Sequence, residues 1–154
     1  MSVSLYGSGQ TVIQVLSTTT TALFSTSSAS FVDVTGLSVT ITPQATTSKI
    51  LVLANICGGS AASNVYINLV RNGTNIAQST GGTQNQTVFW GLPTASVMQQ
   101  APINYLDSPA TTSAVTYKIQ VNSSGGTLTY INGRASDGYY AGVSSITVLE
   151  ISGS

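Results

Sequence analysis

The chain has 154 residues, only eight charged side chains, no histidine, one cysteine and a formal net charge of zero. Four basic residues are too few to form a phosphate-binding patch, and without histidine neither a Ser-His-Asp triad nor a His-ligated metal site can form. The longest wholly apolar run, Ile50 to Ala54, is far short of the roughly 20 residues that span a bilayer. Composition therefore argues against partners such as nucleic acid or a membrane, and against most enzyme chemistry.

Short runs of alternating apolar and polar residues, separated by Gly, Pro, Asn and Ser, follow one another from the first residues to the last. This period of two is typical of strands, and strong helix formers are scarce. The first strands are expected at Thr11–Leu16 and Thr20–Ser25. Phe31–Val34 and Leu37–Thr42 predict an extended stretch with a bend near Gly36.

The middle of the chain holds the clearest strand and turn signals. Ile50–Ile56 is nearly continuous in apolar residues, which predicts a strand buried on both faces or an interior strand of a sandwich. Val65–Arg71 and Asn75–Ser79 flank Asn72-Gly73, and Asn-Gly favours a type I′ hairpin turn because both central residues need positive φ.

The second half predicts further strands and one more hairpin. Ser123–Gly126 is expected to turn the strand before it back into a hairpin with the strand after it. In the last strand, Ile146, Val148 and Glu150 are expected to share one face. The expected strands are Thr87–Leu92, Val97–Gln100, Ile103–Leu106, Val115–Asn122, Leu128–Ile131 and Ser145–Ile151.

About ten short strands with apolar residues on both faces predict an all-β fold. The expected architecture is an antiparallel β-sandwich that is jelly-roll-like. Residues 1–10 are predicted to be a flexible N-terminal arm, and residues 11–154 a single β-sandwich domain.

No pattern of residues predicts a catalytic, cofactor-binding or metal site, so the protein is expected not to be an enzyme. The four carboxylates are Asp33, Asp107, Asp137 and Glu150, and their spacing fits neither a calcium loop nor a defined acid pair. Asp107 and Asp137 precede turn residues and are expected to make local turn hydrogen bonds. Cys57 has no nearby base and is expected to fill space in the core.

Two adjacent aromatic pairs, Phe89-Trp90 and Tyr139-Tyr140, are the remaining candidates for a binding site. Alternation in a strand points one member of each pair inward. Exposed aromatic rings beside amide side chains suit the apolar faces and hydroxylated rims of sugars. Trp90, Tyr139 and Tyr140 are therefore candidate glycan contacts, although the outward rings fit subunit contacts equally well.

Several segments resemble a β-domain that is frequent in virion proteins of tailed bacteriophages. They are Ser30–Pro43 followed by Ser48–Val52, then Tyr105–Pro109 with Thr116–Val121, and finally the ending Ser144–Ile151. The resemblance implies a jelly-roll-like domain that often forms homotrimers, either in capsid decoration (cement) proteins or at the tips of tail and head fibres. It implies scaffold roles and no catalytic residues.

Within this resemblance, Asp33 and Lys49 are implied to set strand geometry, and Asp107 and Pro109 to form a turn. The pattern starts near residue 11, with no shaft before it, which favours a decoration protein over a fibre tip. The expected protein is made in the host cytoplasm and binds the outer capsid surface as a homotrimer, with the major capsid protein as its partner.

The N-terminal arm and first strand are the expected capsid contacts, through Leu5, Tyr6, Val12 and Ile13. The alternative is a receptor-binding tip domain of a tail or head fibre that recognises host surface glycan.

Overall fold

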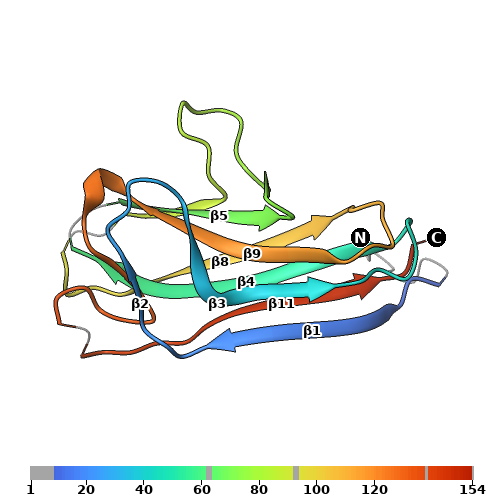
Figure 1. Ribbon diagram of the computed structural model, residues 1–154, viewed down its shortest axis with the longest axis horizontal. Helices are drawn as coiled ribbons and strands as arrows, with labels where there is room; N and C mark the ends of the chain where they lie inside the picture. The colour runs from blue at the N-terminus through green and yellow to red at the C-terminus, as the bar shows by residue number, and fades with distance from the viewer. Residues whose placement is uncertain (1–8, 62–63, 92–93, 138, 154) are drawn as a thin grey trace, which may run out of the picture.

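The computed structural model describes residues 9–61, 64–91, 94–137 and 139–153. Two antiparallel sheets pack face to face as a sandwich, which confirms the predicted all-β class (Figure 1). The described strands are β1 (Val12–Thr20), β2 (Phe24–Thr26), β3 (Val32–Ile41), β4 (Lys49–Ser60), β5 (Asn64–Arg71), β6 (Thr74–Ile76), β7 (Val88–Gly91), β8 (Gln99–Asp107), β9 (Val115–Ser123), β10 (Thr129–Ile131) and β11 (Ser144–Ile151). A short 3₁₀ turn, η1 (Ser124–Gly126), follows β9.

The strand order is that of a jelly roll. In the first sheet, called sheet A here, β1 pairs with β11, β11 with β4, and β4 with β8. In sheet B, β3 pairs with β9, β9 with β5, and β5 with both β6 and β7. The chain crosses between the two sheets several times, which is the connectivity of two interlocked Greek keys.

The core is a single apolar layer between the sheets, formed by the inward side chains of alternating strand positions. On β11, Ile146, Val148 and Glu150 are all fully buried, which confirms the face predicted for the last strand. On β4, alternate residues such as Ile50 and Val52 are fully buried, whereas Leu53 faces outward and is exposed. Of the two expectations for Ile50–Ile56, the interior strand of a sandwich is therefore confirmed, because burial alternates along this stretch and β4 is paired on both sides.

Two expectations about connections differ from the structure. The strands expected at Val97–Gln100 and Ile103–Leu106 form the single strand β8, because Pro102 lies in a strand that pairs on one side only and its missing N–H breaks no ladder bond there. The segment after η1 does not form a hairpin with β9. It crosses to sheet A as β10, which pairs with β2 and β4.

The predicted turn at Asn72-Gly73 is confirmed, since both residues have positive φ, at 46° and 84°. The bend near Gly36 is also present, because Gly36 has a φ of 82° and the pairing of β3 with β9 shifts register between Asp33 and Ser38. The loop between β6 and β7 stands clear of the two sheets (Figure 1).

Candidate interaction surfaces

The four carboxylates all lie in structural contacts. Asp107, at the end of β8, is buried between the sheets rather than held only in a local turn. Both of its oxygens accept hydrogen bonds from Nη1 of Arg71, at 2.8 and 2.9 Å. The hydroxyl of Tyr117 donates to Oδ2 at 2.6 Å. Burial, and next the bond to Asp107, raise the pKa of Tyr117 far above its usual range, so this hydroxyl stays protonated.

Glu150 is a fully buried carboxylate whose hydrogen-bond donors are all neutral. The backbone N–H of Gln44 donates to Oε1 at 2.7 Å, and the side-chain amide of Gln14 donates to Oε2. Burial by itself raises the pKa of Glu150, but the bonds from Gln14 and from backbone N–H groups outweigh it, and the net effect lowers the pKa. The ionised form therefore ties β1, β11 and the segment after β3 together.

Because the pKa of Glu150 is lowered on folding, its carboxylate stabilises the fold above its unfolded value of about 4.5, and this contribution is lost as the pH falls through the folded value. Glu150→Gln places an amide N–H₂ against existing donors, so we expect it to lower the free energy of unfolding by about 1–3 kcal/mol at pH 7. The gap to the wild type should shrink between about pH 5 and pH 3. Urea unfolding at several pH values measures it, and a gap that does not change with pH would contradict this assignment.

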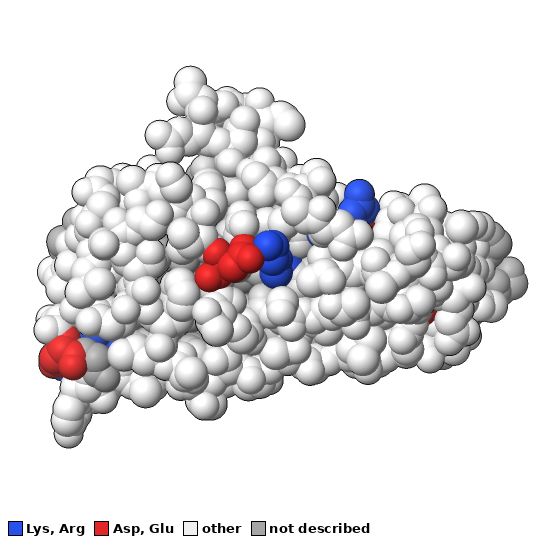
Figure 2. Space-filling view, in the orientation of Figure 1, with Lys and Arg blue, Asp and Glu red and all other residues white. Residues whose placement is uncertain are grey.

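Asp33 and Asp137 are more exposed and lie in surface pairs. Asp33 accepts hydrogen bonds from Nζ of Lys118 at 2.6 Å and from the amide of Gln120 at 2.7 Å, and these bonds lower its pKa. Asp137 pairs with Arg134 and accepts the backbone N–H of Tyr139 at 3.0 Å, which confirms the local turn bond predicted for it. Figure 2 shows the charged side chains of one face as a few isolated spots on a surface otherwise free of charge.

The candidate glycan contacts need one correction. Trp90 on β7 points into the core and is only 2% exposed, so its indole cannot meet a ligand at the surface. It packs where Gly58 leaves room, since a Cβ on Gly58 would lie 2.9 Å from the indole ring. Phe89, the other member of the pair, is the outward one and is 56% exposed. Alternation predicts that one member points inward but does not say which one.

Tyr139 and Tyr140 lie at the surface, 80% and 56% exposed. Their rings meet edge to face with centroids 5.3 Å apart, and the guanidinium of Arg134 lies 4.4 Å from the centre of the Tyr140 ring. Arg134 is also bonded to Asp137, so the aromatic pair is held by a cation–π contact and an ion pair. These residues precede β11, at the end of that strand opposite to Ile151.

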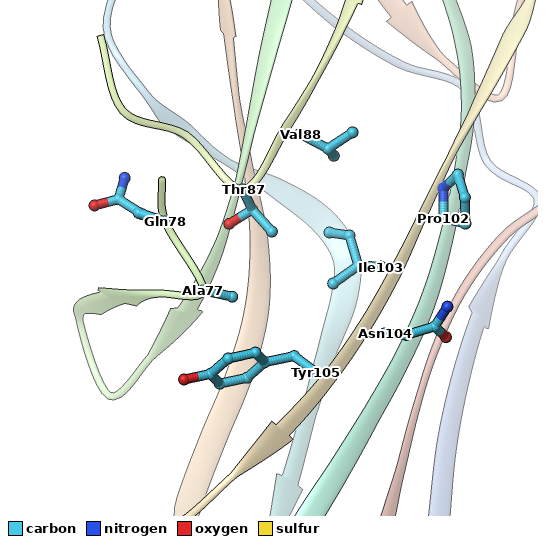
Figure 3. Close-up of a pocket in the computed structure, with 8 residues that line it drawn as sticks. All are labelled: Ala77, Gln78, Thr87, Val88, Pro102, Ile103, Asn104 and Tyr105. Atoms are coloured by element: carbon cyan, nitrogen blue, oxygen red, sulfur yellow. The ribbon is translucent and has the colours of Figure 1, made fainter. Parts of the chain in front are cut away.

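Two shallow cavities flank the loop between β6 and β7. The larger, of about 440 Å³, lies where the edge of sheet A faces sheet B, and Figure 3 shows Thr87, Val88, Ile103 and Tyr105 around it. Its lining combines apolar groups with the amides of Gln78 and Asn104 and the hydroxyls of Thr87 and Tyr105, and includes no charged side chain.

The second cavity, of about 350 Å³, has the lining expected of a sugar site. The rings of Tyr66 and Phe89 line it together with the amides of Asn64, Gln84 and Gln86. Sequence reasoning missed Tyr66 and these amides because they come together only through the pairing of β5 with β7 and the fold of the loop beside them. The amide-rich tract before Val88 was the one available signal.

Of the expected capsid contacts, Val12 and Ile13 are exposed on β1, whereas Leu5 and Tyr6 lie outside the described residues. Gly9 and Thr11, just before β1, are hydrogen-bonded to Ser152, which follows β11. The Ser152 hydroxyl accepts the backbone N–H of Thr11 at 2.8 Å and donates to the carbonyl of Gly9 at 3.2 Å.

The outer face of sheet A carries a group of outward apolar side chains that the sequence analysis did not single out. Antiparallel register places Val15 beside Leu149, Leu149 beside Leu51, and Leu51 beside Leu106, in one row across four strands. Adjoining rows add two more. We call this group the apolar patch: Val15, Leu51, Leu53, Leu106, Leu149 and Ile151.

Within the described ranges, no three His, Cys, Asp or Glu side chains gather closely enough to hold a metal ion. No helix in this part of the chain has the length and apolar character needed to cross a membrane.

The fold and these surfaces define an all-β jelly-roll sandwich with exposed apolar and aromatic areas. No protein-family model matches the chain, and no curated protein matches its sequence. Solved structures with a similar fold include infectious bursal disease virus, Gt strain, at 17% identity and a TM-score of 0.46, covering 90% of this chain and 40% of that chain. An insecticidal delta-endotoxin from Bacillus thuringiensis is similar at 16% identity and a TM-score of 0.45, covering 84% of this chain and 20% of that chain.

Eiger TNF from S. frugiperda is also similar, at 8% identity and a TM-score of 0.39, covering 91% of this chain and 94% of that chain. The chain spans less than half the length of the virus and toxin chains. Several of the similar structures are of virus particles, but a toxin and a TNF share the likeness, which concerns the fold alone.

Proposed function

We propose that this chain is a non-enzymatic virion structural protein, a capsid decoration protein of a tailed bacteriophage. On this proposal it is made in the host cytoplasm and binds the outer capsid surface as a homotrimer. It contacts the major capsid protein and stabilises the contacts between capsid subunits. It needs no cofactor.

The observation that carries the proposal is how the charged groups are used. All four carboxylates of the chain lie in hydrogen bonds that connect strands or fix a turn. General acid–base chemistry needs a titratable group that can reach a substrate, and these groups are occupied by scaffold contacts. What remains accessible is suited to contact rather than to reaction: the apolar patch and the exposed start of β1. The resemblance to phage virion domains adds the class of particle.

Addition of purified protein to phage shells that lack it tests the proposal. We expect saturable co-sedimentation with the shells, and shells that then withstand higher temperature. Deletion of residues 1–10 should weaken this binding at least tenfold and leave the melting temperature of the free protein within a few degrees. Tyr139→Ala/Tyr140→Ala is the matched surface control and should still bind. Wild-type protein that does not bind the shells would overturn the proposal.

The second candidate function is recognition of host surface glycan at the tip of a fibre, and the cavity beside Tyr66 and Phe89 favours it. Stacking of a sugar on an aromatic ring is lost when the ring is removed. On this alternative, Phe89→Ala or Tyr66→Ala should abolish binding to host glycan and leave binding to shells unchanged. Immunogold labelling of the parent particles separates the two functions, since label over the head supports decoration and label only at fibre tips supports receptor binding.

A further inference from the structure

The two outer faces of the sandwich differ in character. On β3 and β9 of sheet B the outward side chains are polar and bonded to one another, as in the pair Asp33–Lys118 and in the hydroxyls of Thr40 and Thr116, 2.8 Å apart. On sheet A the corresponding rows hold the apolar patch. A solvated sheet face is ordinarily polar, so β3 and β9 have the expected pattern and the outer face of sheet A departs from it.

The apolar patch reaches both edges of sheet A. Val15 on β1 is 56% exposed and Leu106 on β8 is 54% exposed, while Leu149 and Leu51 fill the row between them. Among the described outward residues of these four strands, Lys49 is the one charged side chain, and its Nζ donates to the Ser108 hydroxyl at 2.8 Å. Farther from the chain ends, the outward face of sheet A carries polar side chains, namely Ser17, Thr147 and Asn104.

We propose that this face of sheet A binds a second copy of the same chain. The inference rests on the proposed function in that it locates the contact of the homotrimer. Interfaces between permanently associated copies are more apolar than those between proteins that meet only later. The patch offers no charge to select a different partner, and two copies of a chain with zero net charge approach one another without repulsion.

The size of the face agrees with such a contact. Four strands about 4.8 Å apart and paired over roughly 25 Å give a face on the order of 500 Å². Two copies that meet through this face bury on the order of 1,000 Å² together, which is at the low end of the range of specific interfaces. We therefore expect association that depends on the protein concentration.

Sedimentation equilibrium of the full chain from about 1 to 200 µM tests the inference. We expect the wild type to be multimeric at the upper concentrations. Val15→Lys/Leu106→Lys changes two exposed residues of the patch, and it should raise the dissociation constant at least tenfold. Thr35→Lys/Thr40→Lys adds the same charges on the outer face of sheet B and should leave the mass unchanged. Melting curves establish that each variant folds.

A wild type that stays monomeric throughout this range overturns the inference, and so does a multimer that survives the patch substitutions. If the lysine variant does not fold, Leu53→Gln/Leu106→Gln tests the same face with a milder change, by the same sedimentation measurement. Loss of the multimer in the patch variant alone supports the inference. Failure of the proposed function is distinguishable, because a patch-dependent dimer, or a multimer that does not bind shells, keeps this contact and contradicts decoration by a trimer.

Discussion

Replacement of Asp107 by alanine should lower the free energy of unfolding by about 2–4 kcal/mol, because it leaves a guanidinium and a phenol without their shared acceptor. In the native protein, Arg71 and Tyr117 both donate to this carboxylate, and Tyr117 is fully buried. The Arg71 side chain is 29% exposed, so water restores part of what it loses, whereas the buried Tyr117 hydroxyl is left without an acceptor. Urea unfolding at pH 7 measures the difference.

Asp33→Ala is the matched control for Asp107→Ala. Its carboxylate also meets a cation, Lys118, but its side chain is 53% exposed and water replaces the lost partner. We expect a loss of no more than about 1 kcal/mol. Tyr117→Phe removes one donor and keeps the ion pair, so it should fall between the two. A loss for Asp107→Ala no larger than that for Asp33→Ala would show that the buried pair contributes little.

Asn132→Ala is expected to have a similarly large effect, of about 2–4 kcal/mol, because two buried groups and one partly exposed carbonyl lose their partner. The amide of Asn132 donates to the carbonyls of Thr20 and Ala22 at 2.9 and 3.0 Å, and its oxygen accepts the Ser144 hydroxyl at 2.6 Å. The Ser144 hydroxyl in turn accepts the backbone N–H of Cys57 at 2.9 Å. One side chain thus joins the end of β1, the start of β11 and the middle of β4.

Asn72→Ala separates this network from the effect of backbone conformation. Asn72 and Asn132 both have positive φ, at 46° and 64°, so alanine is strained at either position. Asn72 is exposed and accepts one backbone N–H, that of Thr116, at 2.8 Å. We expect Asn72→Ala to lower the free energy of unfolding by about 1 kcal/mol, measured by the same urea titration. Equal losses in the two variants would assign the effect of Asn132 to its backbone alone.

The local signals in the sequence predict much of this fold. Alternation places β9 and β11 within a residue of their ends, and Asn72-Gly73 predicts its hairpin because positive φ is a local requirement. The prediction of a hairpin after β9 is wrong. A turn sequence indicates that the chain reverses direction, but it does not indicate which sheet the chain enters next. Pairing of β10 with β2 and β4 is decided by packing far away in the sequence.

The surfaces were harder to predict than the fold. The contacts of Asp107 look like a local turn in the sequence because the residue precedes Ser-Pro, whereas its partners come from two other strands. The apolar patch is absent from any single segment, because it consists of one or two residues from each of four strands and depends on their register. Apolar residues on both faces of β4 and β11 are its trace in the sequence, and they do not say which neighbours the register brings together.

The pairing of β1 with β11 alone has a consequence for how the chain folds during synthesis. Val12 meets Ile151 and Thr20 meets Ser144, so the first strand has no partner in sheet A until β11 has been synthesised. Contacts so distant in sequence slow folding, since a long loop must close before they form. The nascent chain therefore carries an apolar first strand unpaired while the strands between β1 and β11 are made, and we expect closure of this edge of the sheet to be a late step of folding.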